Sequence, residues 1–393
     1  MWADASHALP QRNAARRAER GLPHIQSLGR SGGNVAPMDG VAELVPVLPA
    51  HRFDEAALAG HLRGRLPGFD GPLRVRQFQG GQSNPTFHLH TAEGEYVLRK
   101  KPPGTLLPRA HDVEREHRVM SALRDTDVPV PRMRLMCNDE SVIGTAFFIM
   151  DHVRGRIFHD PALPNCSPAQ RAAIYEDLAR VLAALHGVDW RAAGLEGFGR
   201  PEGYLQRQVA LWTRQWQGAR VEDMPAMDML AQWLPEHLPS DDEPACIAHG
   251  DYRLGNVLIH PSEPRIVAVL DWELATIGHP LADLGYTCLT YHLSPEFSGT
   301  KGVAGEDLTG TGIPDEQAFV ASYCRHADRE PPRSLDAFIV FSMFRLASIT
   351  AGVWRRGLDG NAADSRAGTS EVRDRYRALA RMAWALAQRL SDG

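Results

Sequence analysis

The stretch that decides the fold is CIAHGDYRLGNVLIH at residues 246–260, followed by PRIVAVLDWE at residues 264–273. Both contain short apolar runs of the kind that form buried strands, and polar residues lie beside those runs. The patterns on either side are mostly helical. The two stretches therefore predict loops bounded by buried strands, which would hold a few polar side chains in fixed positions.

Three polar residues in these stretches form a set that phosphoryl transfer needs. Asn256 lies five residues after Asp251, and Asp271 lies twenty residues after it. In that chemistry one carboxylate orients the attacking hydroxyl and accepts its proton, while hard oxygen ligands position the Mg²⁺ that bridges the nucleotide phosphates. An isolated His-Gly-Asp would more often be a turn with a capping aspartate, so the prediction depends on the whole set.

HGDYRLGN at 249–256, followed by VLDWE at 269–273, resembles the catalytic and metal loops of the aminoglycoside phosphotransferase and choline kinase superfamily. The resemblance implies that Asp251 is the catalytic base and that Asn256 and Asp271 are magnesium ligands. It also implies that His249 braces the loop. Glycine stands between this histidine and the aspartate, as in the small-molecule branch, where protein kinases carry arginine. A small substrate is therefore favoured over a protein.

Asp283, in GHPLADLGY, resembles a further position of that family. An aspartate ahead of a helix is more often a cap or a loop brace than a reacting group. We therefore interpret Asp283 as structural support.

The sequence pattern changes near residue 151 from mainly strand-like to mainly helical. Alternating apolar residues between turns, as in LRVRQFQ (73–79), FHLHT (87–91) and YVLRK (96–100), predict antiparallel strands, and HDVEREHRVMSAL (111–123) predicts an amphipathic helix. Long helical patterns dominate after Asp151. Together with the resemblance, this predicts an α+β, bilobal protein-kinase-like fold, with a nucleotide-binding lobe at 38–150 and a mainly helical catalytic and substrate-binding lobe at 151–393.

The first lobe is expected to bind ATP. GGQSN (80–84) lies between two strand patterns, where nucleotide kinases place a phosphate-covering loop, so Gly81, Ser83 and Asn84 are candidate ATP contacts. Taken alone, a Gly-Gly hairpin turn is the plainer interpretation. FFIMDHVRG (147–155) matches the hinge of such kinases, where backbone groups near Asp151 and Val153 would bind the adenine edge.

A cation on the strand YVLRK is expected to meet the α and β phosphates and to pair with a carboxylate of the following helix. The lysine of the family aligns best with Arg99, while Lys100 would point to the opposite face of the strand. Glu116 is the expected carboxylate and Glu114 its rival. The alternative is that both are solvated helix charges.

One helical pattern is a candidate binding surface for the substrate that accepts the phosphoryl group. It is GYLQRQVALWTRQWQGAR (203–220), where Arg207, Arg214 and Trp212 are candidate contacts for an apolar substrate with anionic groups. An amphipathic helix with solvated arginines is the alternative. The chain resembles the kinase domain that is fused to acyl-CoA dehydrogenases in some eukaryotic proteins, and also the stand-alone bacterial relatives of that domain. The resemblance covers roughly residues 45–385 and is carried by this helix, by VLRKKPPG (97–104) and by FRLASITAGVWRRGLDGNA (344–362).

That resemblance implies phosphorylation of a hydroxyl of a small molecule, foremost a hydroxyacyl-CoA or a related hydroxy acid. Two alternatives stay open: a kinase of another hydroxylated metabolite or of an aminoglycoside, and a nucleotide-binding pseudokinase that regulates a partner. The intact set of Asp251, Asn256 and Asp271 argues against the pseudokinase.

The composition of the 393-residue chain bounds its partners and compartment. Hydrophobic residues make up 43% and the net charge is −5, which gives no global electrostatic argument for nucleic acid or an anionic membrane. No secretory segment or run of about 18 apolar residues is evident, so a cytoplasmic location is expected. We interpret residues 1–37 as a disordered tail, or as the result of a start codon that was assigned too early. Five scattered cysteines indicate neither a disulfide framework nor a zinc site: Cys137, Cys166, Cys246, Cys288 and Cys324.

Overall fold

The computed structural model describes residues 43–79, 84–102, 112–239, 243–360 and 367–392. The predicted tail or early start at 1–37, and the candidate ATP contacts Gly81 and Ser83, lie outside these residues.

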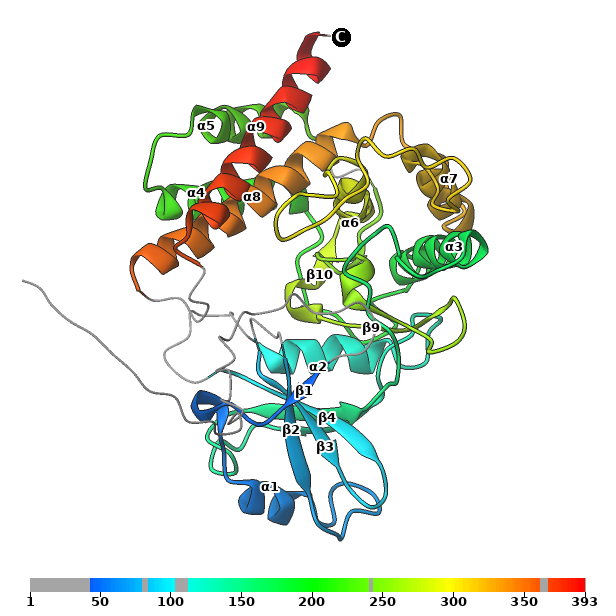
Figure 1. The fold of residues 1–393 in the computed structure, drawn as a ribbon, viewed down its shortest axis with the longest axis vertical. Helices are drawn as coiled ribbons and strands as arrows, with labels where there is room; N and C mark the ends of the chain where they lie inside the picture. Colours follow the sequence, from blue (N-terminus) through cyan, green and yellow to red (C-terminus); the bar gives the residue numbers. More distant parts are fainter. Residues whose placement is uncertain (1–42, 80–83, 103–111, 240–242, 361–366, 393) are drawn as a thin grey trace, which may run out of the picture. The chain divides into compact units, whose positions relative to one another are not determined.

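The N-terminal part is one antiparallel sheet with strand order β1-β2-β3-β4-β6-β5 (Figure 1). Alternating side chains point to opposite faces, so residues of one strand join two different cores. Leu98 packs with Leu58 of one helix, whereas Val97 packs with Val113 of another. The elements are β1 (Leu44–Val45), α1 (Glu55–Leu62), β2 (Arg74–Phe78), β3 (Thr86–His90), β4 (Glu95–Lys100), α2 (Val113–Ala122), β5 (Met133–Cys137) and β6 (Phe147–Asp151).

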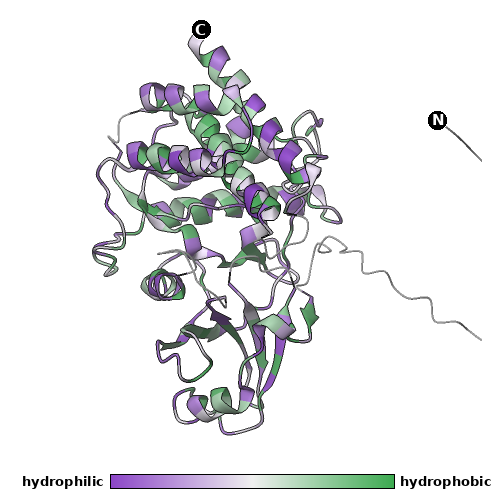
Figure 2. Ribbon diagram, turned by 90° about the vertical axis from the view of Figure 1, so that its left-hand side faces the viewer, coloured by the Kyte–Doolittle hydropathy of each residue, from purple (hydrophilic) through white to green (hydrophobic). Residues whose placement is uncertain are grey.

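The C-terminal part is mainly helical, and hydrophobic and hydrophilic residues alternate along its helices (Figure 2). Its α-helices are α3 (Pro168–His186), α4 (Tyr204–Ala219), α5 (Pro225–His237), α6 (Pro280–Thr287), α7 (Glu316–His326), α8 (Asp336–Leu358) and α9 (Ser370–Asp392). The short strands are β7 (Cys246–Ala248), β8 (Val257–Ile259), β9 (Ile266–Val269) and β10 (Thr276–Gly278). An antiparallel sheet followed by a helical part confirms the predicted α+β class.

Two antiparallel strand pairs position the polar loops predicted from the sequence. β7 pairs with β10, and β8 pairs with β9. The first loop runs from β7 to β8 and contains the short 3₁₀-helix η2 (Leu254–Asn256), while the second follows β9 and contains η3 (Trp272–Leu274). Because all four strands are mostly buried, both loops start from rigid backbone.

Helix α8 modifies the expectation that no segment is apolar enough to span a membrane. By length and composition it could cross one, and it is the only such helix in the part of the chain that the structure describes. However, 72% of the most apolar 18-residue stretch of this helix is buried inside the protein, where the helix packs against α4, α6 and α9 among others. A core helix gives the same signal. The five cysteines are all buried, and none forms a disulfide with another.

Candidate active site

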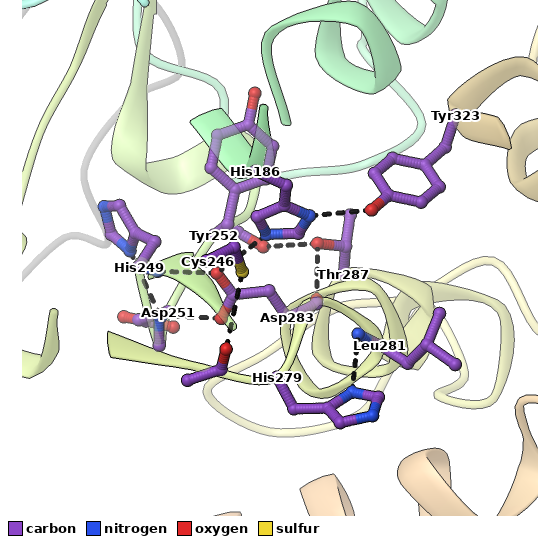
Figure 3. A network of polar contacts seen from close by, with 12 residues as sticks. His186, Cys246, His249, Asp251, Tyr252, His279, Leu281, Asp283, Thr287 and Tyr323 are labelled. Atoms are coloured by element: carbon purple, nitrogen blue, oxygen red, sulfur yellow. Dashed lines mark hydrogen bonds and ion pairs between the residues drawn. The ribbon is translucent and has the colours of Figure 1, made fainter. Parts of the chain in front are cut away.

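The backbone between β7 and Asp251 is held by the buried carboxylate of Asp283 on α6 (Figure 3). Its Oδ2 accepts a hydrogen bond from His249 N at 2.5 Å, and its Oδ1 accepts one from Gly250 N at 2.8 Å. Burial opposes ionisation of this group, but the neighbouring His186 and His249 and the Gly250 N–H hold its pKa below the ordinary value. The charged carboxylate of Asp283 therefore braces the backbone of His249 and Gly250.

His249 ties the first loop to the second. Its Nδ1 accepts a hydrogen bond from Asp251 N at 3.1 Å, so its Nε2 carries the proton that is donated to Leu270 O at 2.9 Å. The ring lies 4.6 Å from the ring of Trp272, measured between centroids. Since Leu270 precedes Asp271, one imidazole fixes the two acidic residues relative to each other.

Gly250 is required by the backbone path. Its φ is +84°, and a Cβ there would lie 2.9 Å from Leu274 O. Both the left-handed conformation and the close approach exclude a side chain. The glycine that distinguishes this loop from a protein-kinase loop therefore has a local steric reason.

The Asp251 carboxylate is hydrogen-bonded but remains accessible, with 20% of its side chain exposed. Its Oδ2 accepts from Asn256 Nδ2 at 2.7 Å, and its Oδ1 lies 3.3 Å from Arg253 Nε. Tyr286 of α6 also hydrogen-bonds to it. These contacts fix the orientation of the carboxylate, which suits a group that accepts the proton of a hydroxyl.

Asn256 and Asp271 fit a magnesium site by their chemistry. Asn256 uses its Nδ2 for hydrogen bonds to Asp251, so its amide oxygen is left as a possible ligand. Asp271 has φ of 64° and ψ of 59°, a strained backbone for a residue other than glycine. Its side chain is 36% exposed, with only Oδ1 held by Arg99. An amide oxygen and a carboxylate are ligands that Mg²⁺ accepts.

Arg99 of β4 lies between two carboxylates from distant segments. Its Nε is 3.0 Å from Glu116 Oε2 of α2, and its Nη2 donates to Asp271 Oδ1 at 2.7 Å. Asn84 Nδ2 donates to Glu116 Oε1 at 2.7 Å. Burial lowers the pKa of Arg99, but the two carboxylates outweigh it and keep the guanidinium charged. Burial raises the pKa of Glu116 to about 7, although Arg99 opposes the rise.

The rival residues of the sequence analysis lie elsewhere. Lys100 is buried on the opposite face of β4, where its Nζ is 6.0 Å from the ring centroids of Phe53 and Phe87. Glu114 is exposed. The geometry therefore matches the choice of Arg99 and Glu116 as the pair.

The hinge residues offer one backbone donor. Asp151 N donates to Arg132 O at 2.9 Å, and the Asp151 carboxylate forms a bidentate ion pair with Arg134. His152 N is taken by Glu95 O. Among the described residues none accepts a hydrogen bond from Val153 N, so the adenine contact expected at Val153 stays a prediction that this geometry allows.

The three candidate acceptor contacts on α4 are placed differently from one another. Arg207 donates to the backbone carbonyls of Arg200 and Glu202, which precede its own helix, and Arg214 is exposed. Trp212 contacts Arg345 of α8, whose guanidinium carbon is 5.3 Å from the ring centroid. Only this tryptophan is linked by contacts to Asp251, because Arg345 also lies 5.3 Å from the ring of Tyr286.

Sequence reasoning missed three residues of the site: Arg253, Tyr286 and Arg345. Arg253 could have been found, because it lies two residues after Asp251 within the same motif. The other two come from helices α6 and α8 that only the tertiary structure brings together. Arg345 is 6% exposed, and no described acidic side chain forms an ion pair with it.

The fold and the arrangement of these groups define a phosphotransferase that acts on a small molecule. The family profile described as "Phosphotransferase enzyme family" matches residues 74–318. The chain belongs to this family, a small-molecule kinase as the resemblance implied.

Similar proteins agree with this placement. The chain is 45% identical to acyl-CoA dehydrogenase family member 11 of Rattus norvegicus over 329 residues, which cover 82% of this chain and 42% of that protein. It thus spans less than half the length of this curated relative. A crystal structure from Ralstonia eutropha JMP134, assigned provisionally as an aminoglycoside phosphotransferase, is 46% identical with a TM-score of 0.78, covering 86% of this chain and 99% of that one.

A more distant structure shows the fold alone. Spectinomycin phosphotransferase, solved in complex with ADP and spectinomycin, is 12% identical with a TM-score of 0.56. The match covers 86% of this chain and 99% of that one.

We predict that Asp283→Asn lowers the free energy of unfolding by about 1.5–3 kcal/mol, because the amide loses the charge that two backbone N–H groups and His186 meet. Urea denaturation measures this. The matched control is Asp315→Asn, since Asp315 caps α7 and asparagine caps a helix equally well. Equal stability of the two variants would contradict the role of Asp283 as a brace.

We predict that ATP binding weakens as the pH falls from about 8 to about 6. Glu116 has a pKa of about 7, so it is mostly charged above that value and takes up a proton below it, which ends its ion pair with Arg99. In Glu116→Gln the pair is absent at every pH. Calorimetric titration with ATP should therefore show a difference between wild type and variant at high pH that vanishes at low pH. A constant difference would exclude the titration of Glu116.

Proposed function

We propose that the protein transfers the γ-phosphoryl group of ATP, in a Mg²⁺-dependent reaction, to a hydroxyl of a hydroxyacyl-CoA or a related hydroxy acid. The observation that carries the reaction is the accessible Asp251 carboxylate beside Asn256 and the Arg99–Asp271 pair. The observation that supports the acceptor class is the similarity to a protein named as an acyl-CoA dehydrogenase family member.

The chain's own groups account for the transfer. Asp251 accepts the hydroxyl proton while the acceptor oxygen bonds to the γ-phosphorus, and the bond from that phosphorus to the bridging oxygen of ADP breaks. Arg99 offers a forked cation to the phosphates and is oriented by Glu116. Asn256 and Asp271 would hold Mg²⁺. When bound, this ion supplies positive charge that offsets the charge of the phosphates.

The surroundings of Asp251 favour an acyl substrate over an aminoglycoside. A pocket borders this residue through Arg253 and Tyr286, and its lining includes no aspartate or glutamate. A polycationic aminoglycoside would leave its ammonium groups beside Arg253 without a partner. An acyl group with a carbonyl or anionic oxygen meets no such penalty.

A regulatory pseudokinase is the weaker candidate. Such a protein has usually lost one of the reacting groups, whereas Asp251, Asn256 and Asp271 are all present and converge on one region through direct contacts or His249. No observation on the described residues favours the regulatory role.

We predict that Asp251→Asn lowers turnover by about 100-fold or more while ATP still binds, because the amide cannot accept the hydroxyl proton. The assay incubates ATP and Mg²⁺ with 3- and 4-hydroxyacyl-CoAs, free hydroxy acids, choline-like alcohols and aminoglycosides, and detects products by mass spectrometry. Asp125→Asn is the control, since that side chain is 91% exposed. Equal turnover of wild type and Asp251→Asn would remove Asp251 from the mechanism. Phosphorylation of aminoglycosides alone would overturn the acceptor class.

A further inference from the structure

A pocket beside the candidate base has a lining that the reaction itself does not require. Two of its lining residues, Arg253 and Tyr286, also contact the Asp251 carboxylate. Other lining residues come from α3, the end of α6, the segment that follows it, and α7, and the rest come from η2 and from loops near residues 160 and 300. A molecule in the pocket would therefore have one end next to Asp251 and the other end inside the helical core.

One part of the pocket wall is apolar and deeply buried. Its walls include Tyr175 and Leu178 of α3, Leu289 of the 3₁₀-helix η4 (Cys288–Tyr291), and Phe319 of α7, each exposed by 4% or less. Apolar walls give no hydrogen bonds to water, so a hydrocarbon chain that displaces water from them gains hydrophobic free energy. The interior therefore suits an alkyl chain.

Two hydroxyl groups of the lining lack partners. Thr290 Oγ1 and Tyr291 Oη are both buried, and neither has a hydrogen-bond partner among the described residues. A buried polar atom without a partner is costly and rare in a folded protein. A hydrocarbon chain cannot bond to these hydroxyls, so a water molecule or an oxygen of the acyl group is needed beside them when the pocket is filled.

The rim of the pocket is polar and carries basic side chains. Arg253 and His159 both approach Gly255, because a Cβ there would lie 2.5 Å from Arg253 Nη1 and 3.2 Å from His159 Nδ1. Lys301 also lines the pocket and forms an ion pair with Asp160 at 2.7 Å. These donors suit the carbonyl or anionic oxygen of an acyl group rather than a cation.

The pocket is small. Its volume is about 50 Å³, whereas one water needs roughly 10–15 Å³ measured in the same way. A short alkyl chain fits in that space, but a long one does not. The apolar wall, the polar rim and the limited volume together describe a site for a short acyl chain.

We propose that this pocket binds the hydrocarbon chain of the acceptor and restricts it to short acyl groups, with the hydroxyl presented to Asp251. The inference rests on the proposed function, because it names where the acyl acceptor lies. It adds the residues that set chain length: Leu178, Leu289, Thr290 and Phe319.

Binding without turnover tests the pocket separately from the reaction. Calorimetric titration with butyryl-CoA, which has no hydroxyl to phosphorylate, should give tighter binding than dodecanoyl-CoA to the wild-type protein. Thr290→Ile adds carbon to the pocket and removes a hydroxyl that has no partner. It should weaken butyryl-CoA binding by about tenfold or more. Thr213→Ile is the matched control, since Thr213 Oγ1 is equally buried and unpartnered but lies outside the pocket lining.

A variant that enlarges the pocket gives the opposite test. Leu289→Ala should shift the binding preference from butyryl-CoA toward hexanoyl- and octanoyl-CoA, whereas Leu230→Ala, in an equally buried position of α5, should not. A loss of stability common to both variants does not produce such a shift. If Leu289→Ala fails to fold, Thr290→Ile against Thr213→Ile decides alone.

Three results would overturn the inference. These are no binding of any acyl-CoA by the wild-type protein, equal binding of short and long chains, and an unchanged affinity of Thr290→Ile. None of them depends on phosphate transfer, so the inference can fail while the enzyme still phosphorylates another hydroxylated acceptor. Conversely, acyl-CoA binding without transfer would support the pocket and reject the proposed acceptor reaction.

Discussion

The buried carboxylate of Asp283 is the constraint on which the candidate site depends. It accepts the N–H groups of His249 and Gly250 at the point where the chain leaves β7. Two hydrogen bonds to a charged acceptor, in a position that water does not reach, fix this backbone more firmly than neutral bonds would. From there His249 links Asp251 to the carbonyl before Asp271, so one side chain connects two loops from different strand pairs.

A second constraint joins the sheet to these loops. Arg99 contacts Glu116 in the N-terminal part and Asp271 in the C-terminal part, so a single guanidinium meets the carboxylates of both. A lysine at this position would offer one point charge, whereas the planar fork of arginine can hold two partners at once. The departure from the family pattern is thus consistent with a working site. It also means that Asp271 is shared between a cation of the protein and the metal it is expected to bind.

The sequence allowed much of the fold and site to be predicted, because its information there is local. Alternating apolar residues predicted the strands. The spacing of Asp251, Asn256 and Asp271 predicted two loops that together serve phosphoryl transfer. Strand parity separated Arg99 from Lys100, whereas the choice of Glu116 over Glu114 was settled only by the structure. By contrast, Tyr286 and Arg345 reach the site from helices whose sequence patterns describe only core packing, and the pocket is formed by residues from six segments that lie far apart in the sequence. The arginines of α4 stay a prediction for the same reason: helical periodicity says which face of a helix is polar, but it does not say what that face contacts.

A crystal structure of the protein with Mg²⁺ and a non-hydrolysable ATP analogue tests the central claim most directly, because the claim concerns which side chains meet the nucleotide and its metal. The account predicts that Asp271 and Asn256 contribute oxygen ligands to Mg²⁺, that Arg99 remains against Glu116 and contacts the phosphates, and that Asp251 faces the γ-phosphate without binding the metal. A structure in which Asp271 stays on Arg99 alone and the nucleotide lies away from Asp251 would contradict it.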